Sequence, residues 1–584
     1  MDYDEILKGV GYFSKWHIFQ VFILSTYATF AAFGILSFSF TGLAPKEFRC
    51  LIPECQEDLK SATVDEYGTD IFWRDGEDID YCKTRPVIES KIDSGHCAND
   101  SFNFDPHLKK SEYLTCNSNS KIVYGAFGMD STAVTEYNLV CQDEYKVFLT
   151  ASITMSAMLV GSYVFGYLAD RIGRKITSIA SLFIIGIGLL LGAFMPEYIS
   201  FTAARFIAGF GSVGALVLGL GNCVEIVGLK YKTLAGLVSH IPFPIGEIII
   251  GLLAMNVRDY STFQWILSIP CFIMGILLIF LQSESPRWLI KRKKYAKASA
   301  VIQHILKFNK IDPSPHLSNI TVQYPENASS HNNDTKGDIN IADGPLGTLD
   351  LFRHAECRKV TIIMMTVWIS VNIGYYGITL SSISLSSDIY LNFILQAVVE
   401  IPGTITCILL LDHVGRKPLL VTSLCLIGMC CVPAGVVAPS GLKTTLVITA
   451  KFGASMAFAV AYIHTVEMYP TVIRATGLGL SSLAGRIGGL LAPLVALYLP
   501  NLTFDTLPLI LFGSLSILAG ILACWLPETL GSPLVESLDD LYVVREHSKP
   551  FFSWWSSTQV YENIKMVNSL RTPIQKSNVK KYTS

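Results

Sequence analysis

The sequence has little charge for its length. Of its 584 residues, 16% are charged and 51% are hydrophobic, and the mean hydropathy is +0.43. A soluble enzyme of this size covers its surface with charged side chains, so the composition argues against that class. The sequence also lacks a Ser/His/Asp, metal or phosphate-loop constellation where such chemistry would work. We therefore expect no enzymatic activity, no metal site, no resident cofactor and no nucleic-acid partner.

Apolar residues are gathered in long runs. A helix needs about 20 such residues to cross a hydrocarbon core of about 30 Å. Six runs precede a polar central segment and six follow it. They lie near 17–41, 147–169, 176–195, 201–222, 233–256, 262–282, 360–380, 389–411, 418–438, 444–466, 475–499 and 505–526. The sequence predicts an all-α membrane protein with twelve transmembrane helices.

The two sets of runs carry matching motifs. Asp170-Arg171-Ile172-Gly173-Arg174-Lys175 recurs in the second set as Asp412-His413-Val414-Gly415-Arg416-Lys417. Glu225 precedes Lys232 with the spacing by which Glu467 precedes Arg474. A looser pair, Glu284-Ser285-Pro286-Arg287 and Pro527-Glu528-Thr529, closes each set. These markers indicate a duplicated membrane protein of two pseudo-symmetric six-helix halves, with a substrate site between them.

Basic residues are sorted to one side of the predicted bundle. Arg171, Arg174 and 291–294 all fall on it, so by the positive-inside rule this side is cytosolic. We expect a multi-pass protein of the plasma membrane with both termini in the cytosol. The predicted segments are a cytosolic N-terminus with the first span (1–41), an extracellular cysteine-rich loop (42–146), spans two to six (147–282), a cytosolic loop (283–359), spans seven to twelve (360–526) and a cytosolic tail (527–584). The stretch 288–308 is predicted to form one short surface helix.

The predicted outer loop contains an even set of cysteines. An even set on the outer face indicates about three disulfides, with fifteen possible connectivities. Asn99-Asp100-Ser101 is a glycosylation sequon on the same face. The candidate disulfide residues are Cys50, Cys55, Cys82, Cys97, Cys116 and Cys141.

Few charged residues lie inside the apolar runs. Glu247, Glu400, Lys451 and Arg486 do so. A charge at the bilayer centre costs at least about 2.5–3.5 kcal/mol on insertion scales, so such residues usually face water or a partner. Two acids and two bases indicate a substrate of mixed charge, or a cation in a compensated site. The alternative is fixed pairing between helices, for example of Glu400 with Lys451.

Aromatic and polar residues share these candidate helices. Aromatic faces attract quaternary ammonium groups by about 2 kcal/mol or more when desolvated. Trp368 and Tyr375 fall on one helix face. The alternative for such residues is packing or contact with lipid. The candidate substrate-binding residues are His240, Glu247, Trp368, Asn372, Tyr375, Tyr376, Glu400, Lys451, Phe458, Tyr462 and Arg486.

The repeated turns on the basic side are candidate gates. The Arg and Lys residues that follow Asp170 and Asp412 can reach helix C-termini and the nearby Glu225 or Glu467. We hypothesise that the clusters are latches that hold an outward-facing state and open as the halves rock. The alternative is that they only anchor orientation. The candidate gating residues are Asp170, Arg171, Arg174, Glu225, Lys232, Glu284, Arg287, Asp412, Arg416, Glu467, Arg474 and Glu528.

Four longer motifs include the repeated turns and their neighbours: Gly166-Tyr167-Leu168-Ala169-Asp170-Arg171-Ile172-Gly173-Arg174-Lys175, Glu284-Ser285-Pro286-Arg287-Trp288-Leu289, Glu467-Met468-Tyr469-Pro470-Thr471-Val472-Ile473-Arg474 and Leu526-Pro527-Glu528-Thr529-Leu530-Gly531. These motifs resemble the solute carrier 22 family, the organic cation, organic anion and carnitine-type transporters of the major facilitator superfamily. The resemblance spans essentially the whole chain and includes the cysteine-rich loop, which sugar facilitators lack. It implies the major facilitator fold and polyspecific movement of small organic ions by alternating access.

The resemblance is divided between branches of that family. Glu400 resembles an acid of cation carriers, Arg486 resembles the anion and carnitine branches, and Lys451 resembles the carnitine branch. His240, Trp368 and Tyr375 fall at positions that line the pocket in cation carriers, whereas Glu247 matches no branch. We expect small organic cations or carnitine-like zwitterions as substrates, with organic anions as the alternative. A non-transporting membrane receptor is the alternative of another class. A coupling ion such as sodium and the oligomeric state are left open.

Overall fold

The computed structural model describes eight stretches of the chain and a few shorter segments. The stretches are 11–45, 128–228, 231–311, 350–381, 388–437, 441–469, 473–499 and 507–530. Tyr3, Leu7 and short strands between 48 and 124 are described as well. Asn99, the central segment 312–349 and the tail 531–584 lie outside the described residues, so the glycosylation site and the tail stay predictions.

The first half of the bundle is made of six spans. The first is α2 (Lys15–Ser25), α3 (Tyr27–Leu36) and α4 (Phe38–Thr41) in series. The fifth consists of α9 (Lys232–Val238) and α10 (Pro242–Asn256). The other four are α6 (Tyr145–Ile172), α7 (Arg174–Phe194), α8 (Tyr198–Ile226) and α11 (Tyr260–Leu281).

The second half repeats this order. Its helices are α16 (Ala355–Ser381), α17 (Ile389–Val414), α18 (Arg416–Ala434), α19 (Gly441–Met468), α20 (Arg474–Pro493) with the π-helical η9 (Leu494–Tyr498), and α22 (Leu507–Ala523). Over the described residues, eleven helical segments are long and apolar enough to cross a membrane, and α22 is a shorter apolar twelfth. The predicted all-α membrane fold of twelve helices is confirmed.

Two spans, the first and the fifth, are interrupted along their length. Pro242 lacks a backbone N–H, and the chain between α9 and α10 is interrupted just before it. At the break between α3 and α4, the buried Arg205 donates to Ser37 Oγ at 2.8 Å and to the carbonyl of Gly34 at 3.0 Å. A buried charge is therefore satisfied by polar groups that the break exposes. The first break places His240 at the junction of α9 and α10.

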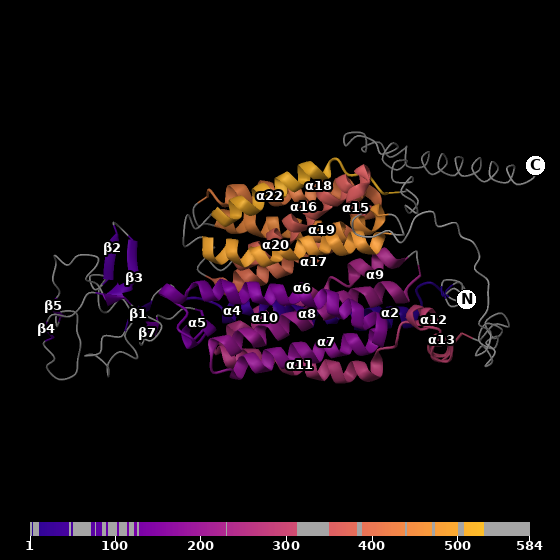
Figure 1. The fold of residues 1–584 in the computed structure, drawn as a ribbon, viewed down its shortest axis with the longest axis horizontal. Helices are drawn as coiled ribbons and strands as arrows, with labels where there is room; N and C mark the ends of the chain where they lie inside the picture. Colours follow the sequence, from indigo (N-terminus) through magenta and orange to yellow (C-terminus); the bar gives the residue numbers. More distant parts are fainter. Residues whose placement is uncertain are drawn as a thin grey trace, which may run out of the picture.

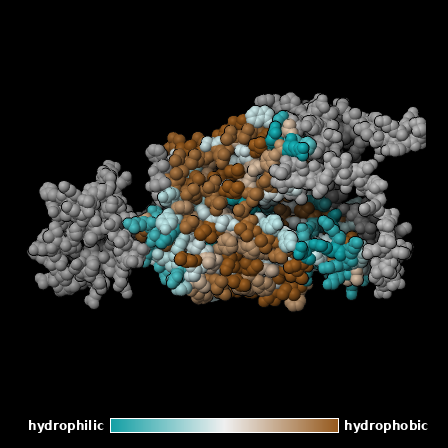
Figure 2. All heavy atoms as spheres, in the orientation of Figure 1, coloured by the Kyte–Doolittle hydropathy of each residue, from teal (hydrophilic) through white to brown (hydrophobic). Residues whose placement is uncertain are grey.

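The two halves lie side by side. Figure 1 shows α6 to α11 in one layer and α16 to α22 in the other. The halves meet where α10 packs on α17 and α6 packs on α20. Figure 2 shows hydrophobic side chains around the middle of the bundle and hydrophilic ones toward its two ends, as expected of a surface that faces lipid.

Each end of the bundle carries short elements. One end, called here the basic face, carries Arg174, Arg416 and the helices α12 (Pro286–Lys291) and α13 (Tyr295–Asn309), with α15 (Asp350–Arg353). The single helix predicted over 288–308 is wrong, because Lys293 adopts a positive φ of 57° and separates α12 from α13. A left-handed residue ends a helix.

The other end, called here the strand face, carries α5 (Ala133–Glu136), η6 (Cys141–Asp143) and seven short strands. The strands are β1 (Phe48–Cys50), β2 (Phe72–Asp75), β3 (Asp78–Thr84), β4 (Glu89–Ser90), β5 (Phe102–Asn103), β6 (Leu114–Thr115) and β7 (Ile122–Tyr124). β1 pairs with β7, β3 lies between β2 and β6, and β4 pairs with β5, with every pairing antiparallel. The sequence analysis did not predict these strands. The pairing pattern of the six cysteines stays a prediction.

A candidate substrate cavity between the halves

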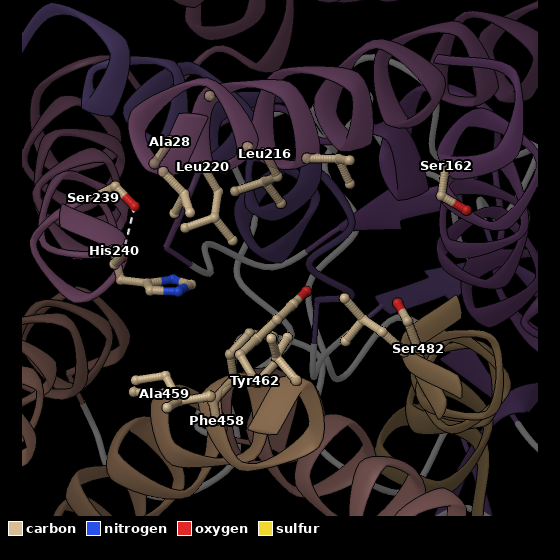
Figure 3. A pocket seen from close by; sticks show the side chains of 18 of the residues that line it. Ala28, Ser162, Leu216, Leu220, Ser239, His240, Phe458, Ala459, Tyr462 and Ser482 are labelled. Atoms are coloured by element: carbon tan, nitrogen blue, oxygen red, sulfur yellow. Dashed lines mark hydrogen bonds between the residues drawn. The ribbon is translucent and has the colours of Figure 1, made fainter. Parts of the chain in front are cut away.

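A cavity of about 1620 Å³ lies between the two halves. Figure 3 shows Leu216, Leu220 and His240 of the first half on one side of it and Phe458 and Tyr462 of the second half on the other. The cavity reaches the basic face. There it is lined by Arg174, Glu225, Lys232, Arg416, Glu467 and Arg474.

Aromatic side chains pack together toward the strand face. Phe40 of α4 stacks on Tyr390 of α17 with ring centroids 5.6 Å apart and contacts Phe393 at 4.9 Å. The Tyr390 hydroxyl donates to the carbonyl of Gly128 at 2.6 Å. These contacts join the two halves, and none of the four residues lines the cavity. The cavity therefore extends to the basic face and stops short of this aromatic contact.

Glu400 and Lys451 form a buried ion pair at the centre of the bundle. Lys451 Nζ lies 2.8 Å from Glu400 Oε1, and the side-chain exposures are 0% and 4%. The same ammonium donates to Thr379 Oγ1 at 2.7 Å and lies 3.4 Å from the centroid of the Tyr375 ring. The structure thus shows the interhelical pair that the sequence offered as an alternative. Glu400 nevertheless lines the cavity, whereas Lys451 lies behind it.

The Tyr375 hydroxyl links two acids. It donates to Glu400 Oε2 at 2.6 Å and lies 3.3 Å from Glu247 Oε1. Tyr375 and Glu400 both belong to the second half, whereas Glu247 belongs to α10 of the first. Like Lys451, Glu247 is buried and does not line the cavity.

An aromatic wall continues from Tyr375. Its ring lies 5.5 Å from that of Phe458, which lies 5.5 Å from that of Tyr462. The imidazole of His240 approaches Tyr462 from the first half at 5.8 Å. All four line the cavity, so they place aromatic faces where a cationic ligand would enter.

Trp368 and Asn372 stand behind this wall. Trp368 contacts Tyr462 edge to face at 4.5 Å and donates its Nε1 hydrogen to Thr465 Oγ1 at 3.0 Å. The amide of Asn372 donates to the Trp368 carbonyl at 2.9 Å. Neither residue lines the cavity, so the structure places both where they support the wall.

Arg486 is a cavity-lining base that forms no ion pair with an acid among the described residues. It lies on α20, its exposed fraction is 8%, and the Tyr376 hydroxyl is close to it. Among the ion pairs between described residues, none includes Arg486. A guanidinium in this setting is available to a carboxylate of a ligand, which its planar fork can bind through both oxygens.

The basic face carries two matching charged clusters. In the first half, Arg174 lies 2.9 Å from both Asp170 and Glu225. In the second half, Arg416 lies 3.1 Å from Asp412 and 3.0 Å from Glu467. Each of these ion pairs joins residues of one half only. These four ion pairs therefore do not tie the two halves to each other at the mouth of the cavity.

A carboxylate supports each repeated turn. Glu284 Oε1 accepts from the backbone N–H of Arg174 at 2.8 Å, and Glu528 Oε1 accepts from that of Arg416 at 3.1 Å. Both carboxylates thus cap the N-terminus of the following helix, where the dipole favours negative charge. The glycines before these helices have φ of 131° and 107°, and a Cβ there would lie 2.7 Å from the capping carboxylate. Glu284 and Glu528 have this structural role whatever else they do.

The other candidate gating residues occupy the same face. Arg287 Nε donates to the carbonyl of Glu225 at 2.8 Å, and Arg474 Nε donates to that of Tyr469 at 3.2 Å. The Arg171 guanidinium lies over the Tyr167 ring at 4.7 Å. Lys232 lines the mouth of the cavity.

Sequence reasoning missed several polar partners of the site. Thr379 and Ser455 contact the buried ion pair, since Ser455 Oγ donates to the carbonyl of Glu400 at 3.1 Å. Each lies four residues after a predicted site residue, Tyr375 or Lys451, and that helical spacing was the available signal. Phe243 was also missed, although it lines the cavity and its ring lies 6.4 Å from Tyr375. Among the described residues, no group of three or more His, Cys, Asp or Glu side chains is placed to hold a metal ion.

Comparison with known proteins agrees with this architecture. Residues 108–540 match the family model described as sugar (and other) transporter. The chain is 32% identical over 572 residues to human organic cation/carnitine transporter 2, covering 93% of this chain and 94% of that protein. It is 34% identical to human solute carrier family 22 member 13, covering 70% and 71%. It is 30% identical to the organic cation transporter protein of Drosophila melanogaster, covering 92% and 94%.

The fold is also similar to a solved transporter. A partially occluded, inward-open conformation of the xylose transporter XylE from E. coli superimposes with a TM-score of 0.58 at 15% identity, covering 89% of this chain and 100% of that one. At this identity the likeness concerns the fold alone. Together, the duplicated twelve-helix bundle, the cavity between its halves and the extent of these matches show that the chain is a membrane transporter of the solute carrier 22 family, within the major facilitator superfamily.

Proposed function

We propose that the chain moves small organic cations and zwitterions, such as carnitine or another betaine, across the plasma membrane by alternating access. Relatives with similarity over nearly the whole chain carry the names organic cation transporter and organic cation/carnitine transporter. The observation that carries the proposal is the cavity lining, where an acid, an arginine and an aromatic wall face one space.

A zwitterion fits this lining best. Its ammonium would lie against the rings of Tyr375, Phe458 and Tyr462 near Glu400, where cation–π attraction contributes about 2 kcal/mol or more once water is excluded. Its carboxylate would pair with Arg486. Lys451 already balances the charge of Glu400, whereas no ion pair between described residues balances Arg486. A ligand that brings its own carboxylate satisfies it.

The shape of the cavity supports the transport cycle. We take the basic face as the cytosolic one, which puts the strand face outside the cell and makes this conformation inward-open. In the outward-open state, the contact of Phe40 with Tyr390 and Phe393 would part and the two basic-face clusters would approach each other. The arginines and acids of the clusters would then act as the latch, with partners from the opposite half. In the proposed orientation, Asn99 and the six loop cysteines lie in the oxidising outer compartment, where glycosylation and disulfides form.

Competition uptake tests the proposal. Cells that express the chain are given labelled carnitine, the monocation tetraethylammonium or a dicarboxylate, and uptake is normalised to surface protein. We expect Arg486→Asp to abolish carnitine uptake and to keep or raise tetraethylammonium uptake. Arg353→Asp, at an exposed position of α15, is the matched control and should resemble the wild type. Dicarboxylate uptake by the wild type, with neither of the other two, would contradict the proposal and favour the organic anion branch.

A further inference from the structure

Glu247 is a buried acid that the proposed substrate site does not use. Its exposed fraction is 1%, and it lies behind the cavity lining. Among the described residues, its Oε2 atom has no hydrogen-bond partner, and its Oε1 atom lies 3.3 Å from the Tyr375 hydroxyl. Among the described residues, no lysine, arginine or histidine forms an ion pair with it.

The donors nearest to Glu247 make shorter contacts with other acceptors. The single hydroxyl hydrogen of Tyr375 goes to Glu400 Oε2, which is the nearer acid at 2.6 Å. The Lys451 ammonium donates to Thr379 Oγ1 and to the carbonyl of Tyr375, and it forms the ion pair with Glu400 Oε1 at 2.8 Å. The Tyr375 hydroxyl can donate to Glu247 Oε1, at 3.3 Å, only by giving up its shorter bond to Glu400. While it donates to Glu400, it faces Glu247 as an acceptor. Glu247 satisfies that contact only when its own carboxyl group carries a hydrogen.

The charges around Glu247 also favour its protonated form. The groups that face Glu247 are Tyr375 and Tyr376 of α16, Glu400 of α17, and Lys451 of α19 behind Glu400. α3, which packs on α10, has no charged residue. The nearest base is thus committed to Glu400, and Glu400 repels a second carboxylate. A buried carboxylate with neither a counter-charge nor a donor is strongly disfavoured, whereas the neutral acid is not.

We propose that Glu247 is a proton-binding site whose occupancy is linked to the position of the two halves. When the cavity is open to the basic face, the carboxyl group of Glu247 donates to Tyr375, which donates to Glu400. This chain crosses between the halves, because α10 belongs to the first and the two acceptors to the second. As the halves rock, Glu247 leaves Tyr375, meets water and gives up its proton, so that a carboxylate and a hydronium ion replace the acid and a water molecule.

This inference rests on the alternating access of the proposed function and adds a ligand to it. A proton that binds one conformation more tightly than the other shifts the equilibrium between them. Acid pH therefore favours the state open to the basic face, and alkaline pH favours the state in which Glu247 is exposed and ionised. The proton is accordingly the coupling ion that this geometry indicates.

Thiol labelling tests the linkage without any substrate. Ser482 of α20 lines the cavity, so Ser482→Cys reports on the open mouth in purified full-length protein. The labelling rate is measured from acid to alkaline pH with and without Glu247→Gln, which mimics the neutral acid. The ratio of the two rates at each pH cancels the pH dependence of the reagent. The protein without Ser482→Cys measures labelling of the eight free cysteines among the described residues.

We expect the rate with Glu247 present, divided by the rate with Glu247→Gln, to be near one at acid pH and to fall several-fold as pH rises. With Glu247→Asp in place of Glu247, the same ratio should also fall with rising pH. A ratio that stays constant with pH would overturn the proposal. If Glu247→Gln does not fold, infrared difference spectra of the wild type and Glu247→Asp decide instead. A protonated-carboxyl band at neutral pH that shifts in Glu247→Asp supports the site, and its absence from the wild type overturns it. A pH-dependent ratio in a protein that moves no organic ion would instead contradict the proposed function alone.

Discussion

The basic face and the centre of the bundle show opposite consequences of duplication. At the basic face the two halves are nearly the same, since each has an arginine paired with an aspartate and a glutamate beside a carboxylate-capped turn. At the centre they differ, because Glu400, Lys451 and Arg486 all come from the second half and Glu247 alone from the first. Symmetry therefore marks the clusters that we propose as gates. Asymmetry marks the part that we propose recognises the substrate.

The largest effect is expected when the buried ion pair of the asymmetric centre is disrupted. Glu400→Gln leaves the Lys451 ammonium buried without its counter-charge, which costs about 3–5 kcal/mol for a buried pair. We expect little folded protein at the surface. The double variant Glu400→Gln/Lys451→Met removes both charges and should recover surface protein but not carnitine uptake. Quantitative surface labelling measures the first result. Normal amounts of the single variant would show that the pair is not required for folding.

The next effect compares the two repeated turns. Gly173→Ala and Gly415→Ala each place a Cβ 2.7 Å from a capping carboxylate, at φ values that only glycine adopts readily. We expect each to lower stability by about 1–3 kcal/mol. The midpoint of thermal unfolding in detergent, read for both variants, measures the loss. Gly441→Ala is the control, because no atom lies within 4 Å of its added Cβ. A loss of stability in only one of the two variants would show that the two turns are not equivalent.

A smaller effect concerns the latch. Asp170 and Asp412 are 64% and 67% exposed, and ion pairs exposed to this degree contribute about 0–1 kcal/mol. Asp170→Asn and Asp412→Asn should therefore leave the stability of this state nearly unchanged. If the aspartates act in the outward-open state, both variants will slow carnitine uptake several-fold at unchanged surface amounts. Initial rates of uptake measure this, with Glu136→Gln as an exposed control away from the basic face. Unchanged rates would dismiss the latch.

The smallest effect separates the aromatic wall from its support. Trp368→Phe removes one buried hydrogen bond, to Thr465, and should cost about 0.5–1.5 kcal/mol of stability. It should leave the KM for carnitine unchanged, because Trp368 does not line the cavity. Tyr462→Leu, in the lining, should raise that KM a few-fold, as expected for a contribution of about 0.5–1 kcal/mol or more. Concentration series of uptake measure both values, and the reverse order would assign Trp368 to the ligand.

Much of the fold was predictable because membrane spans obey a simple rule. Length and hydropathy located the twelve helices, and the repeated motifs located the two halves. The rule does not predict the breaks at Ser37 and between α9 and α10, because these depend on the contacts of Arg205 and on the position of Pro242. It also says little about the strands of the outer loop, whose alternation is too short to read from one sequence.

The sequence predicted which residues belong to the site but not which of them line the cavity. The rarity of charge within the spans singled out Glu247, Glu400, Lys451 and Arg486. Periodicity could not tell which of these face the cavity, because that depends on how helices of different halves rotate against each other. Lys451 and Glu247 lie behind the lining for this reason. Only the packed structure shows that the Tyr375 hydroxyl links Glu247 to Glu400.

Counterflow in liposomes tests the transport account most directly. Purified protein is reconstituted into vesicles loaded with unlabelled carnitine, and a trace of labelled carnitine is added outside. Alternating access predicts that the label accumulates transiently above equilibrium, since outward movement of the load returns the site to the outside. It also predicts that Arg486→Asp removes this accumulation while tetraethylammonium counterflow persists. Binding of labelled carnitine without any accumulation, in vesicles shown to hold folded protein, would contradict transport and favour a receptor.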